Sequence, residues 1–227
     1  MTDTAGRSRR RRPRKLSAAV LAIVMAATLT AAGLVRGEEM NCTAWDLVFD
    51  GYGSASCSGK TVSLRPASAS AADETHAGLA VSREVSVAPG RVTTFEANMF
   101  TRRQLRRGST PNPWEVAWLI WSYQDNDHFY ALVLKPNGWE VSKQNPAYPG
   151  KQQFLASGNT PRFAVGREHH VDITIDTTAS GKMTAAITVD GEHLVSVTDT
   201  DYPYRSGTAA AYTEDADVDV TITPTKP

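Results

Sequence analysis

The chain has 227 residues, of which 41% are hydrophobic and 21% charged, and its formal net charge is zero. This length and apolar content suffice for one domain with a sizeable core and exclude a mainly disordered chain. After residue 37 the chain holds 16 basic and 23 acidic residues, which excludes the positive surface that sequence-independent binding of nucleic acid requires.

Residues 1–37 have the composition of a targeting or anchoring segment. A basic cluster from Arg7 to Lys15 precedes an uncharged run from Leu16 to Val35. This order is typical of a secretory signal, and a run of this length can also cross a bilayer as a helix. Signal peptide and uncleaved anchor both stay open. Either one predicts an extracytoplasmic domain at 38–227, secreted or held at the cell membrane by residues 16–35, with no other membrane contact.

Cys42 and Cys57 are the two cysteines of the chain, and both follow the apolar run. Two cysteines in an exported chain most simply form one disulfide. In the chain-entropy model, a loop of this length stabilises the fold by roughly 3 kcal/mol. A metal site is the weaker interpretation, because no other cysteine or histidine stands at ligand spacing beside them.

The exported part is predicted to consist of strands, because apolar and polar residues alternate and no stretch shows a sustained helical period. In 169–176, for example, Val171, Ile173 and Ile175 share one face. Two long loops are expected at 66–76 and 101–113. Strands this short and closely spaced predict a sandwich or barrel. The predicted strands are 45–50, 91–100, 114–123, 128–135, 139–143, 169–176, 182–190, 194–198, 209–213 and 218–223.

Several segments resemble the concanavalin A-like lectin/glucanase superfamily, in its branch similar to family 16 glycoside hydrolases and 3-keto-disaccharide hydrolases. The resemblance covers roughly residues 45–223. It implies an all-β, two-sheet jelly-roll sandwich whose concave sheet faces a glycan. The segments that carry it are the hairpin Asn112–Tyr130, Lys135–Glu140, the turn Val189–Gly191 and the late strand Thr208–Tyr212.

The chain departs from this superfamily at the catalytic strand. Family 16 enzymes present two carboxylates on alternate residues of one strand, and the nearest segment here, Glu214–Asp217, has a different spacing. Whether the protein is an enzyme is therefore left open. The first hypothesis is a protein that binds a polysaccharide or oligosaccharide of the cell envelope or the extracellular space. The alternatives are a glycoside hydrolase or polysaccharide lyase with an atypical site, and a structural envelope protein.

The candidate carbohydrate site combines aromatic rings, which stack on sugar C–H faces, with charged groups that bind hydroxyls or acidic sugars. Residue parity places Glu115 and Trp121 on one face of the strand 114–123. The alternatives are that the aromatic residues form the core, that Glu115 pairs with a cation, and that the arginines lie in a solvated loop. The carbohydrate-binding candidates are Arg102, Arg103, Glu115, Trp121, Tyr130, Trp139 and Lys143, and the catalytic candidates are Glu115, Tyr130 and His128.

A structural calcium ion is the one cofactor considered, and none is required. Asp215, Asp217 and Asp219 are expected to share a face of the last strand, and Asp50 lies nearby in folds of this superfamily. Calcium takes carboxylate and carbonyl oxygens, so Asp50, Asp217 and Asp219 are the candidate ligands. The alternative is an acidic strand face that keeps the sheet edge from pairing with another chain.

Overall fold

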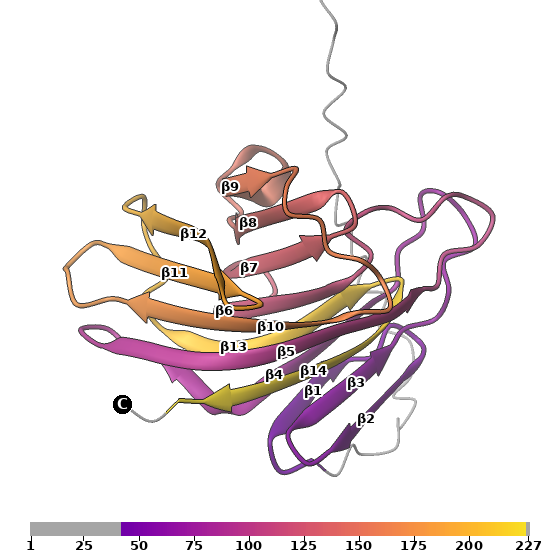
Figure 1. Cartoon of the computed structure of the whole chain (residues 1–227), viewed down its shortest axis with the longest axis horizontal. Helices are drawn as coiled ribbons and strands as arrows, with labels where there is room; N and C mark the ends of the chain where they lie inside the picture. Colours follow the sequence, from indigo (N-terminus) through magenta and orange to yellow (C-terminus); the bar gives the residue numbers. More distant parts are fainter. Residues whose placement is uncertain (1–41, 226–227) are drawn as a thin grey trace, which may run out of the picture. The chain divides into compact units, whose positions relative to one another are not determined.

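The computed structural model describes residues 42–225 and contains two antiparallel sheets of seven strands each, which lie as two layers (Figure 1). The predicted all-β, two-sheet sandwich is confirmed. The strands are β1 (Trp45–Phe49), β2 (Ser54–Ser58), β3 (Thr61–Arg65), β4 (Ala77–Val87), β5 (Val92–Gln104), β6 (Ala117–Asp125), β7 (His128–Lys135), β8 (Gly138–Gln144), β9 (Gln152–Gly158), β10 (Glu168–Asp176), β11 (Met183–Val189), β12 (Glu192–Asp199), β13 (Gly207–Glu214) and β14 (Ala216–Pro224).

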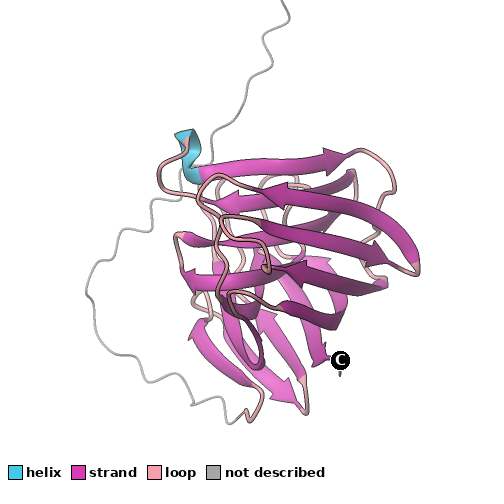
Figure 2. Ribbon diagram, turned by 90° about the vertical axis from the view of Figure 1, so that its left-hand side faces the viewer, coloured by secondary structure: helices cyan, strands magenta, loops and turns pink. Residues whose placement is uncertain are grey.

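Sheet 1 has the strand order β1-β4-β13-β6-β7-β8-β9, and sheet 2 has the order β12-β11-β10-β5-β14-β3-β2. The consecutive hairpins β6-β7-β8-β9 build one half of sheet 1, as short turns between antiparallel strands require. One short 3₁₀ turn, η1 (Pro149–Lys151), stands at a corner of the sandwich between β8 and β9 (Figure 2).

The main core lies between the two sheets and contains side chains from both. Val171, Ile173 and Ile175 of β10 face it with no exposed surface, as their alternation predicts. Leu132 of β7 enters the same core from sheet 1. Burying a side chain of this size stabilises the fold by roughly 1.5–3 kcal/mol, so the alternating pattern fixes which face of each strand is internal.

A second apolar cluster covers the outer face of sheet 1, the face turned away from sheet 2. Trp118 of β6 and Tyr212 of β13 are register partners there, and their rings meet edge to face with centroids 5.0 Å apart. Both faces of the central strands of sheet 1 are therefore buried. The buried members are Leu79, Val116, Trp118, Ile120, Phe129, Ala131, Val133, Ala210 and Tyr212.

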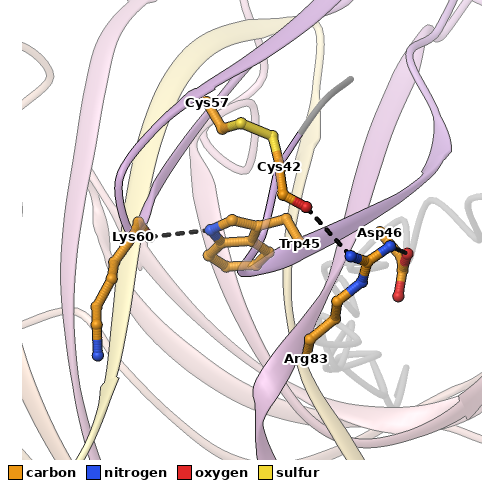
Figure 3. The surroundings of a disulfide bond; sticks show 6 residues. All are labelled: Cys42, Trp45, Asp46, Cys57, Lys60 and Arg83. Atoms are coloured by element: carbon orange, nitrogen blue, oxygen red, sulfur yellow. Dashed lines mark hydrogen bonds and ion pairs between the residues drawn. A yellow bond between two sulfur atoms is a disulfide. The ribbon is translucent and has the colours of Figure 1, made fainter. Parts of the chain in front are cut away.

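The disulfide predicted between Cys42 and Cys57 is present (Figure 3). Cys42 precedes β1 at the edge of sheet 1, and Cys57 lies on β2 at the edge of sheet 2, so the bond joins the edges of the two sheets. The Trp45 indole lies beside it and donates to the carbonyl of Lys60 at 2.9 Å (Figure 3). Arg83 donates to the carbonyl of Cys42 at 3.2 Å.

Four strands lie where no strand was predicted, namely β2, β3, β4 and β9. The sequence of β2, Ser-Ala-Ser-Cys-Ser, has none of the β-branched or aromatic residues that signal a strand. The loop expected at 101–113 is wrong in its first four residues, because β5 continues to Gln104. The strand expected at 114–123 begins only at Ala117, after a turn in which the amide of Glu115 donates to the carbonyl of Asn112.

The predicted signal or anchor at 16–35 lies outside the described residues, as does the predicted boundary at 37. Among residues 42–225 there is no helix with the length and apolar character needed to cross a membrane.

Candidate functional site

Four of the predicted carbohydrate-binding residues contact the interior between the sheets. Trp121 and Tyr130 have no exposed surface, and their rings stack with centroids 5.6 Å apart. Lys143 is also fully buried, and the indole of Trp139 donates to the carbonyl of Thr160 at 2.9 Å. The parity expected for Trp121 and Glu115 fails, because Glu115 precedes the strand. The three rings therefore offer no open face to a sugar, and the ammonium group of Lys143 is not accessible to one.

Lys143 is the centre of a buried polar network. Its ammonium nitrogen lies 2.8 Å from a carboxylate oxygen of Asp199, and the Tyr130 hydroxyl donates to the same oxygen at 2.5 Å. Lys143 also donates to the backbone carbonyls of Asp201 and Tyr202, at 2.6 and 3.1 Å. Burial raises the pKa of Tyr130, and Asp199 raises it further, so the phenol keeps the proton that it donates. The network therefore ties the chain after β12 to the interior.

Three loops meet above this network and form what we call the three-loop surface: residues 123–128, 144–151 and 199–206. Each pair of loops is joined by a direct contact: Asp127 with Lys151 (3.7 Å), Gln124 with the carbonyl of Ser206 (3.1 Å), and the Tyr204 hydroxyl with the carbonyl of Gln144 (3.0 Å). The amide of Tyr204 also donates to the Tyr130 hydroxyl at 2.9 Å. The loops thus support one another and rest on buried side chains.

The three-loop surface is rich in tyrosine. Tyr202 is 89% exposed and has φ 50°, a left-handed conformation that is unfavourable for a bulky residue. Its carbonyl accepts from Lys143 at 3.1 Å, so the buried network holds the backbone here while the ring stays exposed to solvent. The imidazole of His128 meets the Tyr204 ring edge to face at 5.5 Å. The aromatic side chains of this surface are Tyr148, Tyr202, Tyr204 and His128, whereas Tyr123 packs beside Phe129 against the outer cluster of sheet 1.

Carboxylates surround these rings. Asp125 accepts from Nδ1 of His128 at 2.7 Å. Burial raises the pKa of Asp125, but the hydrogen bonds from His128 and from the Asp127 amide outweigh it and lower the pKa below its usual value. Burial, followed by the charges of Asp199, Asp125 and Asp127, raises the pKa of Tyr204 to about 12. The surface therefore combines rings, hydroxyl donors and ionised acceptors.

A different buried cluster lies at the opposite end of β6 and β13, and we call it the carboxylate cluster. Arg106 is at its centre, with Nε 2.5 Å from Glu115 and Nη2 2.9 Å from Asp215. Glu214 joins it and accepts from the hydroxyl of Tyr212 at 2.7 Å. All three carboxylates are buried, and one oxygen of Glu115 has no hydrogen-bond partner. One guanidinium thus faces three acids.

Two acids of the carboxylate cluster have raised pKa values. Burial raises the pKa of Glu214 to about 7; the Tyr212 hydroxyl and Arg106 oppose the shift, and Asp215 and Glu115 add to it. Burial also raises the pKa of Asp215. Buried carboxyls beside like charges behave in this way because ionisation is unfavourable there.

The arginines predicted as an anion clamp lie elsewhere. Arg102 and Arg103 belong to β5 in sheet 2, where Arg102 pairs with Asp219 and Arg103 lies 3.5 Å from Asp217. The calcium candidates Asp217 and Asp219 are thus paired with arginine, and Asp50 accepts from the amide of Tyr52. Asp215 does not share a strand face with Asp217 and Asp219 as predicted, because it precedes β14 and belongs to the carboxylate cluster. Residues 42–225 contain no group of three or more acidic, histidine or cysteine side chains arranged for a metal.

The three catalytic candidates are not brought together. Glu115 lies in the carboxylate cluster, whereas Tyr130 and His128 lie at the other end of the strands. The pocket beside His169 and Phe163 has a volume of only about 10 Å³, which is room for one water molecule.

Sequence reasoning missed the segment 199–206, which supplies Asp199, Tyr202 and Tyr204. The sequence carries a signal there: Asp-Thr-Asp-Tyr-Pro-Tyr places two tyrosines and two acids around a proline, between two predicted strands. Its contacts with Lys143 and Tyr130 span 56 residues or more, and no local pattern encodes them.

No protein-family model and no curated protein matches the chain. The metal-free carbohydrate recognition domain of Emp46p resembles it with a TM-score of 0.52 and 9% identity, over 83% of this chain and 91% of that one. The corresponding domain of Emp47p has a TM-score of 0.48 and 11% identity, over 84% and 92%. Sheep galectin-11 has a TM-score of 0.40 and 11% identity, over 61% and 94%. At these identities the likeness is one of fold.

Proposed function

We propose that the domain binds carbohydrate at the three-loop surface. The observation that carries the proposal is that Tyr148, Tyr202, Tyr204 and His128 lie on three mutually supporting loops above the Lys143 network. Tyrosine offers a rigid ring for the apolar face of a sugar and a hydroxyl for its polar edge, at a small cost in conformational entropy. The adjacent carboxylates accept hydrogen bonds from sugar hydroxyls.

The fold supports the proposal. The carbohydrate recognition domain of Emp46p has a similar fold. Function belongs to sites and not to folds, so the proposal is argued mainly from the residues of the three loops. Their backbone is already held by the buried network, which reduces the entropy lost when a ligand orders a surface.

Binding is favoured over glycan cleavage. Hydrolysis of a glycosidic bond needs two carboxyl groups that flank the bond, and the carboxylates of the carboxylate cluster are buried against Arg106. The lyase alternative relied on Arg102 and Arg103, whose guanidinium groups pair with aspartates on sheet 2. A hydrolase-like activity, a structural envelope role and a calcium ion remain predictions without a site that supports them.

We also propose that the ligand is a cell-envelope or extracellular glycan. The disulfide between Cys42 and Cys57 fits an oxidising compartment. The basic-then-apolar order of residues 7–35 supports the same location.

The test is binding of the purified full-length protein to a glycan panel, with sugar release measured in parallel. Tyr202→Ala and His128→Ala are expected to weaken binding at least several-fold. Tyr52→Ala is the matched control, because Tyr52 is equally exposed and also has a positive φ, but lies in the turn after β1. Loss of binding in the Tyr52 variant alone would move the site to that turn, and an absence of binding to any glycan would refute the proposal.

A further inference from the structure

The charge of the three-loop surface bears on what kind of glycan fits it. Asp125, Asp127 and Asp201 are exposed carboxylates on these loops, and Asp199 lies beneath them. The side chain of Asp201 has no partner within the described residues, and Asp125 stays ionised well into the acid range because its pKa is lowered. Acidic groups thus line the surface from two of its three loops.

The nearby lysines cancel only part of this charge. Lys143 pairs with Asp199, and Lys151 lies 3.7 Å from Asp127, so the charge that no lysine or arginine pairs with is that of Asp125 and Asp201. Arg205 donates to the carbonyl of Thr177 at 2.6 Å, which directs its guanidinium toward the turn after β10. Burial is the main cause of the raised pKa of Tyr204, and the charges of Asp199, Asp125 and Asp127 add to it. The whole exported part is acidic as well, with 16 basic and 23 acidic residues after residue 37.

We infer that the three-loop surface selects glycans by charge: it binds amine-bearing sugars most tightly, neutral sugars less tightly and carboxylated sugars least. This inference rests on the proposed function and adds the chemical class of the ligand. An ammonium group is attracted both to carboxylates and to the faces of tyrosine rings. Two tyrosines, Tyr202 and Tyr204, and two exposed carboxylates, Asp125 and Asp201, place both kinds of partner on adjoining loops. A carboxylated sugar meets the same groups with repulsion.

The experiment uses the full-length protein and oligosaccharides that share a backbone and differ in charge. For each of the gluco, manno and galacto series, the probes are the hexosamine, the N-acetylhexosamine, the hexose and the uronate. Titration calorimetry at low salt is expected to give at least about tenfold tighter binding of the hexosamine than of the uronate on the backbone that binds. The difference should shrink at high salt, because exposed charges are screened.

Two variants locate the effect. The double variant Asp125→Asn, Asp201→Asn is expected to remove most of the preference for the amine while neutral sugars still bind, because an amide oxygen at position 125 can still accept from His128. Asp73→Asn, which changes an exposed carboxylate in the distant loop 66–76, should leave the preference intact.

The possible failures are distinguishable. Equal affinity for all charge classes, a preference for the uronate, or an unchanged preference in the double variant would overturn the inference and leave carbohydrate binding standing. If no probe binds on any backbone, the proposed function fails together with the inference.

Discussion

The two ends of the sandwich both bury a cation, but they differ in how it is matched. At the three-loop end, Lys143 forms an ion pair with one carboxylate, that of Asp199, and donates its remaining hydrogen bonds to backbone carbonyls. At the other end, Arg106 faces three carboxylates. Because Lys143 has a single carboxylate partner, its other hydrogen bonds can position the loop at 199–206. The carboxylate cluster has more acids than cations, so its stability depends on the protonation of Glu214 and therefore on pH.

Removing Arg106 should have the largest effect. Arg106→Met leaves three buried acids without their cation, and breaking a buried ion pair costs about 3–5 kcal/mol. We expect a loss near the upper end of that range at pH 7.5 and a smaller loss at pH 5, where Glu214 is protonated. Urea denaturation at both pH values measures it. An equal loss at the two pH values would contradict a role for proton uptake.

Lys143→Met should come next, with a loss of about 3 kcal/mol, because Asp199 remains buried without its cation. Glycan affinity should fall more than tenfold, since the carbonyls of Asp201 and Tyr202 lose their donor. The double variant Lys143→Met, Asp199→Asn should recover much of the stability but not the affinity. Recovery of both would show that the network supports the fold alone.

Glu214→Gln tests the pH response of the carboxylate cluster. The folded state holds a proton on Glu214 up to about pH 7, whereas the unfolded chain releases it near the ordinary value of 4.5. Folding therefore takes up a proton in this window, and wild-type stability falls as pH rises through it. The variant lacks this loss, so its free energy of unfolding, measured relative to that of the wild type, should rise by about 3 kcal/mol between pH 5 and 8. Glu192→Gln, on exposed β12, should show no such trend.

The smallest expected effect is a gain in stability. Tyr202→Gly relieves the left-handed strain and should stabilise the fold by about 1 kcal/mol while weakening glycan binding. Tyr52→Gly should give a similar gain with no change in binding. Thermal unfolding and glycan titration of both variants make the comparison, and weaker binding in both would show that neither ring marks the site.

The sequence predicted the sandwich because strands such as β10 alternate cleanly, and it predicted the disulfide because two cysteines in an exported chain have one simple use. The proposed surface overlaps the predicted site residues only in part. His128 lies on it, and Tyr130 and Lys143 lie buried beneath it.

The remaining site could not be obtained from parity. A register shift interrupts the β6-β7 pairing between Trp121 and Asp125, and Ser122 has φ 50°. Residue parity therefore cannot say which face of the sheet the side chains beyond this register shift point to. Asp199 and Tyr204 reach the network from the β12-β13 connection, and such a contact follows from the packing of the whole fold.

The disulfide also determines how the domain would carry a mechanical load. If residues 16–35 hold the protein at a membrane while a polysaccharide pulls on the loops, tension enters the domain at Cys42. Without the bond, that tension would act first on β1, a five-residue edge strand that could peel from β4 one hydrogen bond at a time. The covalent link passes part of the force directly to β2 in the other sheet, so the edge strands of both sheets share the load.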